Sequence, residues 1–268
     1  MEKKIGFIGC GNMGGALAIA AAKSIGGQYV CVSDADVEKA TNFASAYNVN
    51  VASVEEIAKT CDYVFLGVKP QVLRSLCDEL ASIFNSREDR FVIVSMAAGI
   101  NLLNLKEMCG GNYPIIRIMP NMPSSVSAGM ILYTGNRFVE ENDYEEFTQI
   151  LKKAGMLDKI DETKIDAASA ISGCGPAFVF MFIDALADGG VRCGLPRDKA
   201  LLYAAETVFG AAKMVVETKE HPGKLKDAVC SPSGSTIEGV LSLENASFRA
   251  DIINAVSRSY ERTVELGK

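Results

Sequence analysis

A glycine fingerprint near the amino terminus constrains the fold of this chain more than any other feature. The apolar run at 5–8 leads into Gly9, Gly11 and Gly14, and an alanine-rich stretch follows. In such a unit the first glycine permits the tight turn, the second lets the backbone approach a pyrophosphate, and the third lets the helix pack on the strand. Asp34 follows a second apolar run, at the spacing where an acid meets a ribose. The pattern predicts a dinucleotide-binding βαβ unit with the phosphates at the helix N-terminus.

The same segment also has the outline of a secretory signal, because Lys3 and Lys4 precede an apolar stretch that ends at Ala20. The apolar region of a signal runs unbroken for about 7 to 15 residues, but glycines and Asn12 interrupt this one. The 8 cysteines include no Cys-x-x-Cys pair and no spacing typical of a metal site. We therefore expect a cytoplasmic protein with reduced thiols and no bound metal.

Composition excludes several classes of function. The chain has 268 residues, of which 49% are hydrophobic, so it is long enough for one large domain or two ordinary ones. Its formal charge is −6 and its basic residues are scattered, so we expect no nucleic-acid partner. The longest apolar run, 177–183, is far shorter than the roughly 20 residues that cross a bilayer, so we expect no membrane helix.

The first 160 residues alternate β-branched runs with helical stretches, which predicts a mostly parallel, doubly wound sheet covered on both faces. The expected strands are 4–8, 29–32, 62–68, 91–95, 114–118, 130–134 and 156–160. The expected helices are 13–23, 37–47, 54–60, 71–84, 102–108 and 141–153.

After Asp161 the strand-like runs end, and the rest of the chain is predicted to be helical. The expected helices are 165–190, 197–218, with Pro196 at its first position, 223–229, 236–244 and 248–266. The middle of 165–190 is apolar almost all round, which suits a helix covered by a partner subunit. We predict an α/β protein with a Rossmann-type dinucleotide-binding domain over 1–160 and a helical substrate-binding domain over 161–268. The C-terminal helices are expected to join it into a homo-oligomer, at least a dimer.

Six segments, in the same order along the chain, resemble the pyrroline-5-carboxylate reductases, which reduce a cyclic imine to proline with a nicotinamide cofactor. They are 6–13, 68–70, 95–99, 120–123, 172–177 and 221–236. The likeness covers nearly the whole chain. The family more often has other residues at Cys10, Met122, Cys174, Phe178 and Ser233. Ser233 stands where glycine is usual, beside the expected substrate loop, so this departure bears most directly on function.

The resemblance implies a cofactor, NAD(P)H, at the carboxyl ends of the parallel strands, where ligands of open sheets bind. The implied contacts are Gly9, Gly11, Asn12, Met13, Gly14, Asp34, Ser53, Val68, Lys69, Pro70, Met96, Ala97 and Ala98. Structural roles stay open for three of these places. Pro70 can simply start a helix beside a solvated Lys69, and the alanines before Gly99 can form a small-residue turn. Ser53 can cap a helix and form a capping box with Glu56.

Asp34 bears on the choice between the two nicotinamide cofactors. A carboxylate there accepts hydrogen bonds from both ribose hydroxyls but faces a 2′-phosphate with like charge, which typically costs several kcal/mol. Many relatives have small hydroxyl residues at this point, and an arginine usually binds the phosphate. Here Lys39 is the nearby cation in sequence. We expect NADH to be used at least as well as NADPH.

The implied substrate site is a hydroxyl-rich loop that runs into a helix. Its residues are Ser231, Ser233, Gly234, Ser235 and Thr236, and Glu162 is a further implied contact. Free N–H groups at such a helix start can bind the substrate carboxylate. Thr236 resembles the family threonine that meets the ring nitrogen, as proton donor or orienting group, and is the expected catalytic residue. A capping box of Ser235 with Glu238, and an ordinary first-turn carboxylate at Glu162, are the structural alternatives.

Two further places allow a functional or a structural interpretation. His221 is the one histidine and lies at a helix start, where a structural or gating role is favoured over acid–base catalysis. Residues 172–176 are expected to form a glycine-kinked turn that packs closely on the substrate ring or on another helix.

Two other functions remain as alternatives. A β-hydroxyacid dehydrogenase needs a lysine on the central helix, and 165–190 contains none. A non-catalytic nicotinamide sensor has no need of the loop hydroxyls. The expected reaction requires neither a metal nor a strong nucleophile, because the nicotinamide supplies the hydride.

Overall fold

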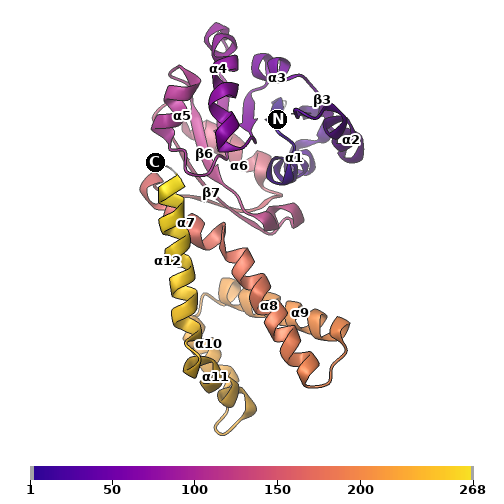
Figure 1. Cartoon of the computed structure of the whole chain (residues 1–268). Coiled ribbons are helices and arrows are strands. Elements are labelled where there is room, and N and C mark those ends of the chain that lie inside the picture. Colours follow the sequence, from indigo (N-terminus) through magenta and orange to yellow (C-terminus); the bar gives the residue numbers. More distant parts are fainter. Residues whose placement is uncertain (1–2, 267–268) are drawn as a thin grey trace. The chain divides into compact units, whose positions relative to one another are not determined.

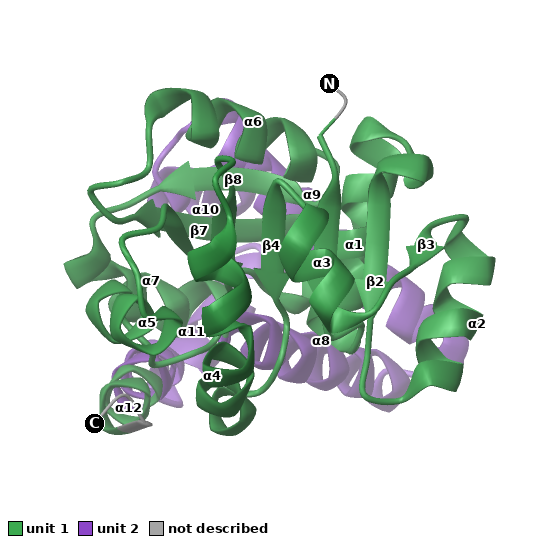
Figure 2. Ribbon diagram, turned by 90° about the horizontal axis from the view of Figure 1, so that it is seen from above, with its two compact units in different colours: residues 1–173, 259–268 green, residues 174–258 purple. Residues whose placement is uncertain are grey.

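The computed structural model describes residues 3–266 and divides into two compact units (Figures 1 and 2). Unit 1 extends to Gly173 and resumes at Ser259, whereas unit 2 is Cys174–Arg258. The unit boundary therefore differs from the predicted division after residue 160. The physical reason is that the first helix of the C-terminal half, α7 (Glu162–Ser172), packs against the last part of the sheet and joins unit 1.

Unit 1 is built on an eight-stranded sheet in the order β3-β2-β1-β4-β5-β6-β7-β8. All neighbouring strands are parallel except β6 and β7, which are antiparallel. The strands are β1 (Ile5–Ile8), β2 (Val30–Ser33), β3 (Asn50–Val51), β4 (Tyr63–Leu66), β5 (Val92–Ser95), β6 (Ile115–Met119), β7 (Gly129–Gly135) and β8 (Gly155–Lys159). The predicted mostly parallel, Rossmann-type sheet is confirmed. Strand β3 was not predicted, because its two residues are exposed at the sheet edge and have no apolar pattern.

Helices cover both faces of this sheet. One face carries α1 (Asn12–Ile25), α2 (Val37–Tyr47) and α6 (Glu141–Leu151), whose buried side chains meet Phe7, Phe65 and the other strand residues of that face. The opposite face carries α3 (Val54–Thr60), α4 (Pro70–Ser86) and α5 (Leu102–Cys109). Successive strand residues point to opposite faces. Burial on both sides explains why β1, β4 and β5 are continuous apolar runs.

Some element ends differ from the predicted ones for local reasons. The expected strand 62–68 stops at Leu66, although the N–H of Gly67 still donates to the carbonyl of Ile8 at 2.8 Å, because the chain bends at Val68 before α4 begins. Tyr29 ends a short 3-10 helix, Gly27–Tyr29, before β2 begins. A second 3-10 helix, Met122–Val126, connects β6 to β7.

The expected helix 165–190 is two helices, α7 and α8 (Gly175–Arg192). Pro176 lies in the first turn of α8, where a missing N–H is tolerated, and its ring does not fit the interior of a continuous helix. The remaining helices are α9 (Arg197–Thr218), α10 (Pro222–Val229), α11 (Ser235–Asn245) and α12 (Phe248–Leu266). Pro196 is the N-cap of α9 instead of its first residue.

Unit 2 exposes many large apolar side chains. Its buried cluster consists of Ala187, Ala200 and Ala204, while Phe180 is 53% exposed and Met181 is 73% exposed. Among the described residues, the stretch Glu162–Arg192 is long and apolar enough to cross a membrane by length and composition, contrary to the expectation of none. The break between α7 and α8 interrupts this stretch. The longest unbroken apolar run, 177–183, is much shorter than this stretch, because small and polar residues separate the other apolar residues.

Candidate functional site

The sheet reverses its strand order between β1 and β4, because β2 and β3 extend from one side of β1 and β4 lies on the other. In open α/β sheets, ligands bind outside the carboxyl ends of the strands at such a switch point. Gly9 follows β1 and Gly67 follows β4, so the two glycines meet at this place. A Cβ on Gly67 would lie 2.8 Å from the carbonyl oxygen of Gly9.

The three glycines of the fingerprint occupy the environments that their roles require. Gly9 has a φ of +98°, a conformation that side chains disfavour. A Cβ on Gly14 would lie 2.1 Å from the carbonyl oxygen of Gly9, so only glycine allows α1 to pack this closely on the turn. A Cβ on Gly11 would meet nothing within 4 Å, which leaves its backbone open to a ligand. Gly11 also caps α1 without a side-chain hydrogen bond, so no side chain at the cap competes with an anion for the first N–H groups of α1.

Asp34 is held beside the glycine loop by several hydrogen bonds. Its Oδ2 accepts the N–H of Cys10 at 3.0 Å and Nζ of Lys39 at 2.9 Å, and its Oδ1 accepts the N–H of Asp36 at 3.3 Å. The Cys10 thiol lies 3.4 Å from the same Oδ2. Burial raises the pKa of Asp34, but these hydrogen bonds outweigh it and hold the pKa below its ordinary value. Asp34 is therefore a charged carboxylate at the edge where a ribose is expected.

The segments predicted to surround the nicotinamide follow β4 and β5 at the same sheet edge. Lys69 is the exposed N-cap of α4, and Pro70 is its first residue, so the structural alternative for these two residues is confirmed, and their contact with the cofactor remains a prediction. Met96 continues the ladder, with its N–H 3.5 Å from the carbonyl of Leu66. Ala97 is buried and Ala98 is exposed. The structure thus brings residues 68–70 and 96–98 to the edge that carries Asp34 and the glycine loop.

Ser53 has the structural role that the sequence left open. Its hydroxyl caps α3 by accepting the N–H of Glu56 at 3.1 Å. This confirms the N-cap role of Ser53, whereas the capping box with Glu56 remains a prediction; the hydroxyl proton of Ser53 stays available to an acceptor. A contact of Ser53 with the adenosine ribose remains a prediction.

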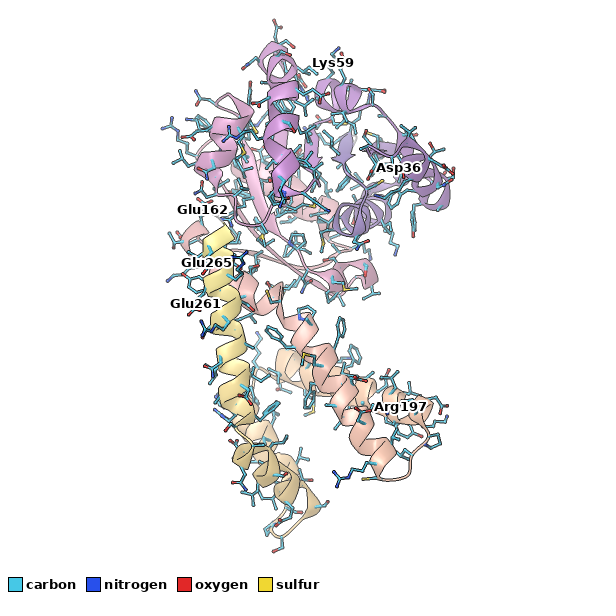
Figure 3. The ribbon with its side chains drawn as sticks, viewed as in Figure 1. Asp36, Lys59, Glu162, Arg197, Glu261 and Glu265 are labelled. Carbon is cyan, nitrogen blue, oxygen red and sulfur yellow. The ribbon has the colours of Figure 1, made fainter. Side chains whose placement is uncertain are left out.

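Glu162 begins α7 (Figure 3) and takes part in a network that the sequence did not predict. Its Oε1 accepts the N–H of Leu102 at 2.6 Å, at the start of α5, and lies 3.5 Å from Nη1 of Arg117. Arg117, on β6, is 2% exposed and also contacts Asp166 with Nη2 at 2.5 Å from Oδ1. Glu162 therefore holds α5 and α7 to the sheet. A single arginine within the apolar run 115–119 is the signal that could have revealed this network.

The predicted substrate loop lies in unit 2, between α10 and α11. The structural alternative, a capping box of Ser235 with Glu238, is wrong, because Gly234 is the N-cap of α11 and Ser235 is its first residue. Gly234 has no side chain to accept the first N–H groups, so they are free to bind an anion. Ser235 and Thr236 are exposed in the first turn. The hydroxyls and the open helix start are thus on the same short segment.

Ser233 adopts a backbone conformation that favours glycine, the residue usual at this position. Its φ is +57°, in the left-handed region that glycine enters without strain. The family more often has glycine there, so the loop keeps its conformation in this chain at the expense of backbone strain. The neighbouring Gly234 is tightly packed, since a Cβ there would lie 2.4 Å from Oγ of Ser231.

His221 caps α10, with Nδ1 accepting the N–H of Gly223 at 3.0 Å. The structural role expected for His221 is confirmed. Among residues 3–266, no group of His, Cys, Asp and Glu is placed to hold a metal ion.

Two family models match this chain. One is described as pyrroline-5-carboxylate reductase dimerisation and matches residues 162–266. The other is described as NADP oxidoreductase coenzyme F420-dependent and matches residues 4–99. The second match covers the glycine loop, Asp34 and the segments after β4 and β5.

Full-length relatives agree with these matches. The chain is 42% identical to the pyrroline-5-carboxylate reductase of Escherichia coli, over 100% of both chains. The solved pyrroline-5-carboxylate reductase of Coxiella burnetii superposes with a TM-score of 0.91 at 30% identity over 100% of both chains. The Plasmodium falciparum pyrroline carboxylate reductase, solved with NADP bound, has a TM-score of 0.87 at 32% identity over 99% of this chain and 98% of that one. This chain belongs to the pyrroline-5-carboxylate reductase family.

Proposed function

We propose that this chain reduces the C=N bond of 1-pyrroline-5-carboxylate to give L-proline, with NAD(P)H as the hydride donor. The observation that carries the proposal is full-length similarity to reductases of this name, combined with an intact nucleotide-binding edge in unit 1. The reaction makes the protein an oxidoreductase of proline biosynthesis. When bound, the nicotinamide supplies the hydride.

The residues after the parallel strands fit such a cofactor. Gly11 leaves the backbone open for a pyrophosphate, and Gly9 and Gly14 form the tight turn below it. Asn12 and Met13 open α1, whose N-terminus favours negative charge. We propose that residues 68–70 and 96–98 contact the nicotinamide and its ribose, and that Ser53 contacts the adenosine ribose.

We further propose that NADH is used at least as well as NADPH. The support is the charged state of Asp34, whose carboxylate accepts ribose hydroxyls and repels a 2′-phosphate. Lys39 reduces this repulsion, because its ammonium lies 2.9 Å from the Asp34 carboxylate. The lysine is 45% exposed, so it is free to reorient toward a phosphate. The relative solved with NADP bound shows that NADP is compatible with this fold.

The first turn of α11 is the proposed substrate-binding element. Its unpaired N–H groups and the serines at 231, 233 and 235, with Gly234, would hold the substrate carboxylate. Thr236 would orient the ring nitrogen and donate the proton that balances the hydride. Hydride transfer requires the reacting carbons to approach to about 3–3.5 Å, so the contribution of these residues is positioning.

Glu162 is a weaker candidate for substrate binding. Its Oε1 is occupied by the N–H of Leu102 and by Arg117. Only Oε2 is then available to face a substrate. We propose that Glu162 acts mainly by holding the start of α5, and that any substrate contact uses Oε2.

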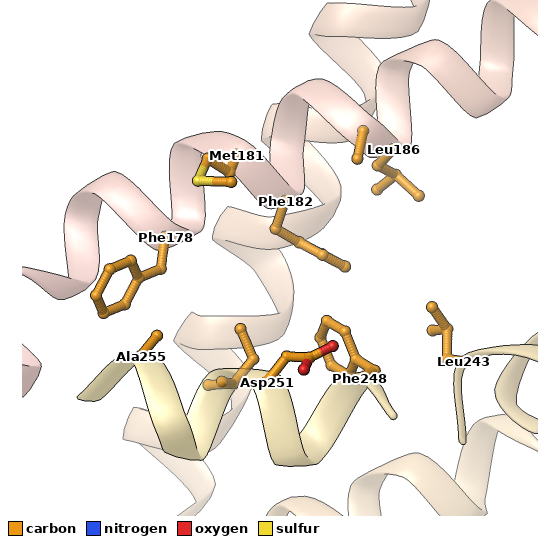
Figure 4. A pocket seen from close by; sticks show the side chains of 10 residues that line it. Phe178, Met181, Phe182, Leu186, Leu243, Phe248, Asp251 and Ala255 are labelled. Atoms are coloured by element: carbon orange, nitrogen blue, oxygen red, sulfur yellow. The ribbon is translucent and has the colours of Figure 1, made fainter. Parts of the chain in front are cut away.

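We propose that the active protein is a homo-oligomer joined through its C-terminal helices. The dimerisation family model covers 162–266, where large apolar side chains are exposed. Within unit 2 a cavity of about 480 Å³ lies between α8 and α12 (Figure 4). It is lined by Phe178, Met181, Phe182, Leu243, Phe248 and Ile252, among others. A second copy that covers this surface would remove it from water, so we interpret the apolar stretch Glu162–Arg192 as an interface and not as a membrane segment.

One assay separates the proposed function from its alternatives. Purified protein is mixed with NADH or NADPH and 1-pyrroline-5-carboxylate, and the loss of absorbance of the reduced cofactor is followed. Turnover that yields proline supports the reductase. Turnover only with a β-hydroxyacid and NAD would indicate a dehydrogenase, and cofactor binding without any turnover would indicate a sensor.

We also propose a cytoplasmic location. The 8 cysteines are all free thiols in the structure, which agrees with a reducing compartment.

A further inference from the structure

Two cysteines far apart in the sequence lie side by side in unit 1. Cys31 is on β2 and Cys61 follows α3, and their sulfur atoms are 3.4 Å apart. Gly6 makes this approach possible, because a Cβ on Gly6 would lie 2.9 Å from the Cys61 sulfur. The two sulfurs need to approach by little more than 1 Å to reach the roughly 2.0 Å of a disulfide bond.

A small cavity of about 260 Å³ opens onto this pair. Cys31 is partly exposed there and Cys61 is buried. Polar and charged side chains also line the cavity, namely Lys4, Gln28, Asn50, Glu56 and Thr60. Such a lining admits water and small polar reagents. A second close pair, Cys77 and Cys109 at 3.7 Å, is buried on both sides and offers an internal comparison.

The cavity lies at the amino ends of the parallel strands, whereas the proposed cofactor site lies at their carboxyl ends. Lys4 precedes β1, Cys31 is near the start of β2, and Cys61 precedes β4, whereas the glycine loop follows the end of β1. Because these strands are parallel, their starts and ends lie at opposite edges of the sheet. Chemistry at the cysteine pair is therefore separate from the site that binds the nucleotide.

The electrostatic surroundings make the pair easier to ionise than an isolated buried thiol. The hydrogen bond from Cys31 lowers the pKa of Cys61 despite its burial, and the charge of Arg87 acts in the same direction. Arg87 is held nearby, since its Nη1 donates to the carbonyls of Ala58 and Cys61, each at 2.8 Å. The same hydrogen bond raises the pKa of Cys31, so Cys61 is the thiol of the pair that loses its proton more readily.

We propose that Cys31 and Cys61 form an oxidation-sensitive site that a hydroperoxide converts into an intrachain disulfide. Cys61, the thiol with the lowered pKa, first loses its proton to water in the cavity, and the proton of Cys31 then passes to Cys61. The Cys31 thiolate attacks the peroxide, whose O–O bond breaks to give a Cys31 sulfenic acid and, with hydrogen peroxide, a hydroxide that the released proton neutralises. The Cys61 sulfur then attacks Cys31, the S–O bond breaks, and water leaves with the Cys61 proton. In total, two thiols give two electrons to one peroxide. A thiol reductant reverses the step.

The disulfide would close the segment from β2 to the end of α3 into a covalent loop, since Cys31 and Cys61 are 30 positions apart in the sequence. A cross-link of this length reduces the freedom of the unfolded chain and stabilises the folded one. The oxidised protein should therefore unfold at a Tm about 5–10 °C higher than the reduced protein. The closed segment also carries Asp34 and Ser53, so the oxidised state would restrain the proposed ribose-binding residues.

The test uses full-length protein with Cys193→Ser, which removes an exposed thiol that would form bonds between molecules. The protein is treated with hydrogen peroxide, quenched with an alkylating reagent, and mapped by mass spectrometry without reduction. We expect a peptide pair joined through Cys31 and Cys61, formed at least about tenfold faster than any pair joined through Cys77 and Cys109.

Two variants keep the test decisive. In Cys31→Ser, which changes a partly exposed residue, the cross-link and the rise in Tm should both disappear, and Cys61→Ala should give the same result. Cys77→Ala is the matched control and should retain both effects. The proposal is overturned if no Cys31–Cys61 peptide forms, if the Cys77–Cys109 pair reacts as fast, or if Cys31 is oxidised to a sulfinic acid while Cys61 stays a thiol. None of these measurements depends on reductase activity.

Discussion

Replacing Asp34 by serine removes a charged acceptor from the edge of the proposed ribose site and keeps a small hydroxyl there. In the present structure the Asp34 carboxylate is 15% exposed and binds Lys39 at 2.9 Å. A 2′-phosphate about 6 Å from this carboxylate would be repelled by about 3 kcal/mol at the effective dielectric constant near a protein surface. Serine removes that repulsion and frees Lys39 to bind the phosphate. Losing a charged hydrogen bond to the ribose weakens NADH binding by about 1.5–3 kcal/mol.

Both changes favour NADPH, so the ratio of kcat/KM for NADPH to that for NADH should rise by roughly a hundredfold or more. The assay is steady-state kinetics with each cofactor at saturating 1-pyrroline-5-carboxylate. Lys39→Gln in the Asp34→Ser background is the matched control, because it should remove most of the gain in NADPH efficiency. High salt should also reduce the gain, since it screens the contact between lysine and phosphate.

Two results would contradict the proposed role of Asp34. A wild-type protein with a large preference for NADPH would show that the carboxylate does not face the 2′ position. A change of less than twofold in the cofactor ratio of a well-folded Asp34→Ser protein would have the same meaning. Folding is checked by the Tm, because the N–H of Cys10 loses an acceptor in this variant.

Three further predictions concern unit 2. Thr236→Val should lower kcat about a hundredfold by removing one positioned donor, with the NADH Kd unchanged; full activity would exclude the role of Thr236. Ser233→Gly should relieve the strain of a φ of +57° and stabilise the protein by about 1 kcal/mol in urea unfolding, and a loss of stability would contradict the strain argument. Met181→Lys, at a side chain that is 73% exposed, should shift the protein toward monomer in light scattering. A Lys213→Met variant, on a charged surface of α9, should keep the oligomer intact and serves as the comparison.

Most of the secondary structure followed from local patterns. Helices α2, α3 and α9 have the bounds that the sequence predicts, because caps such as Asp36 and Ser53 act on N–H groups only a few residues away. The strands were recognisable because burial on both faces demands apolar runs. The glycine fingerprint predicted the turn after β1, since the conformation of Gly9 and the packing of Gly14 are properties of that short segment.

Local patterns failed where two neighbouring signals competed. At the start of α11 both Ser235 and Gly234 are suitable caps, and the backbone of the preceding loop places Gly234 at the cap position. Between α7 and α8 the expected glycine-kinked turn at 172–176 coincides with the break, but the apolar residues on both sides of it led to the prediction of one helix instead of two.

The sequence by itself determined the α/β class, the nucleotide-binding turn and the charged residue that follows β2. The tertiary structure decided which distant side chains meet: Asp34 with Cys10, Arg117 with Glu162, and Cys31 with Cys61. The physical reason is that helices and turns depend on contacts between residues close in the chain, whereas these pairs depend on the order of strands in the sheet. That order results from the packing of all helices and strands together, and no single segment encodes it.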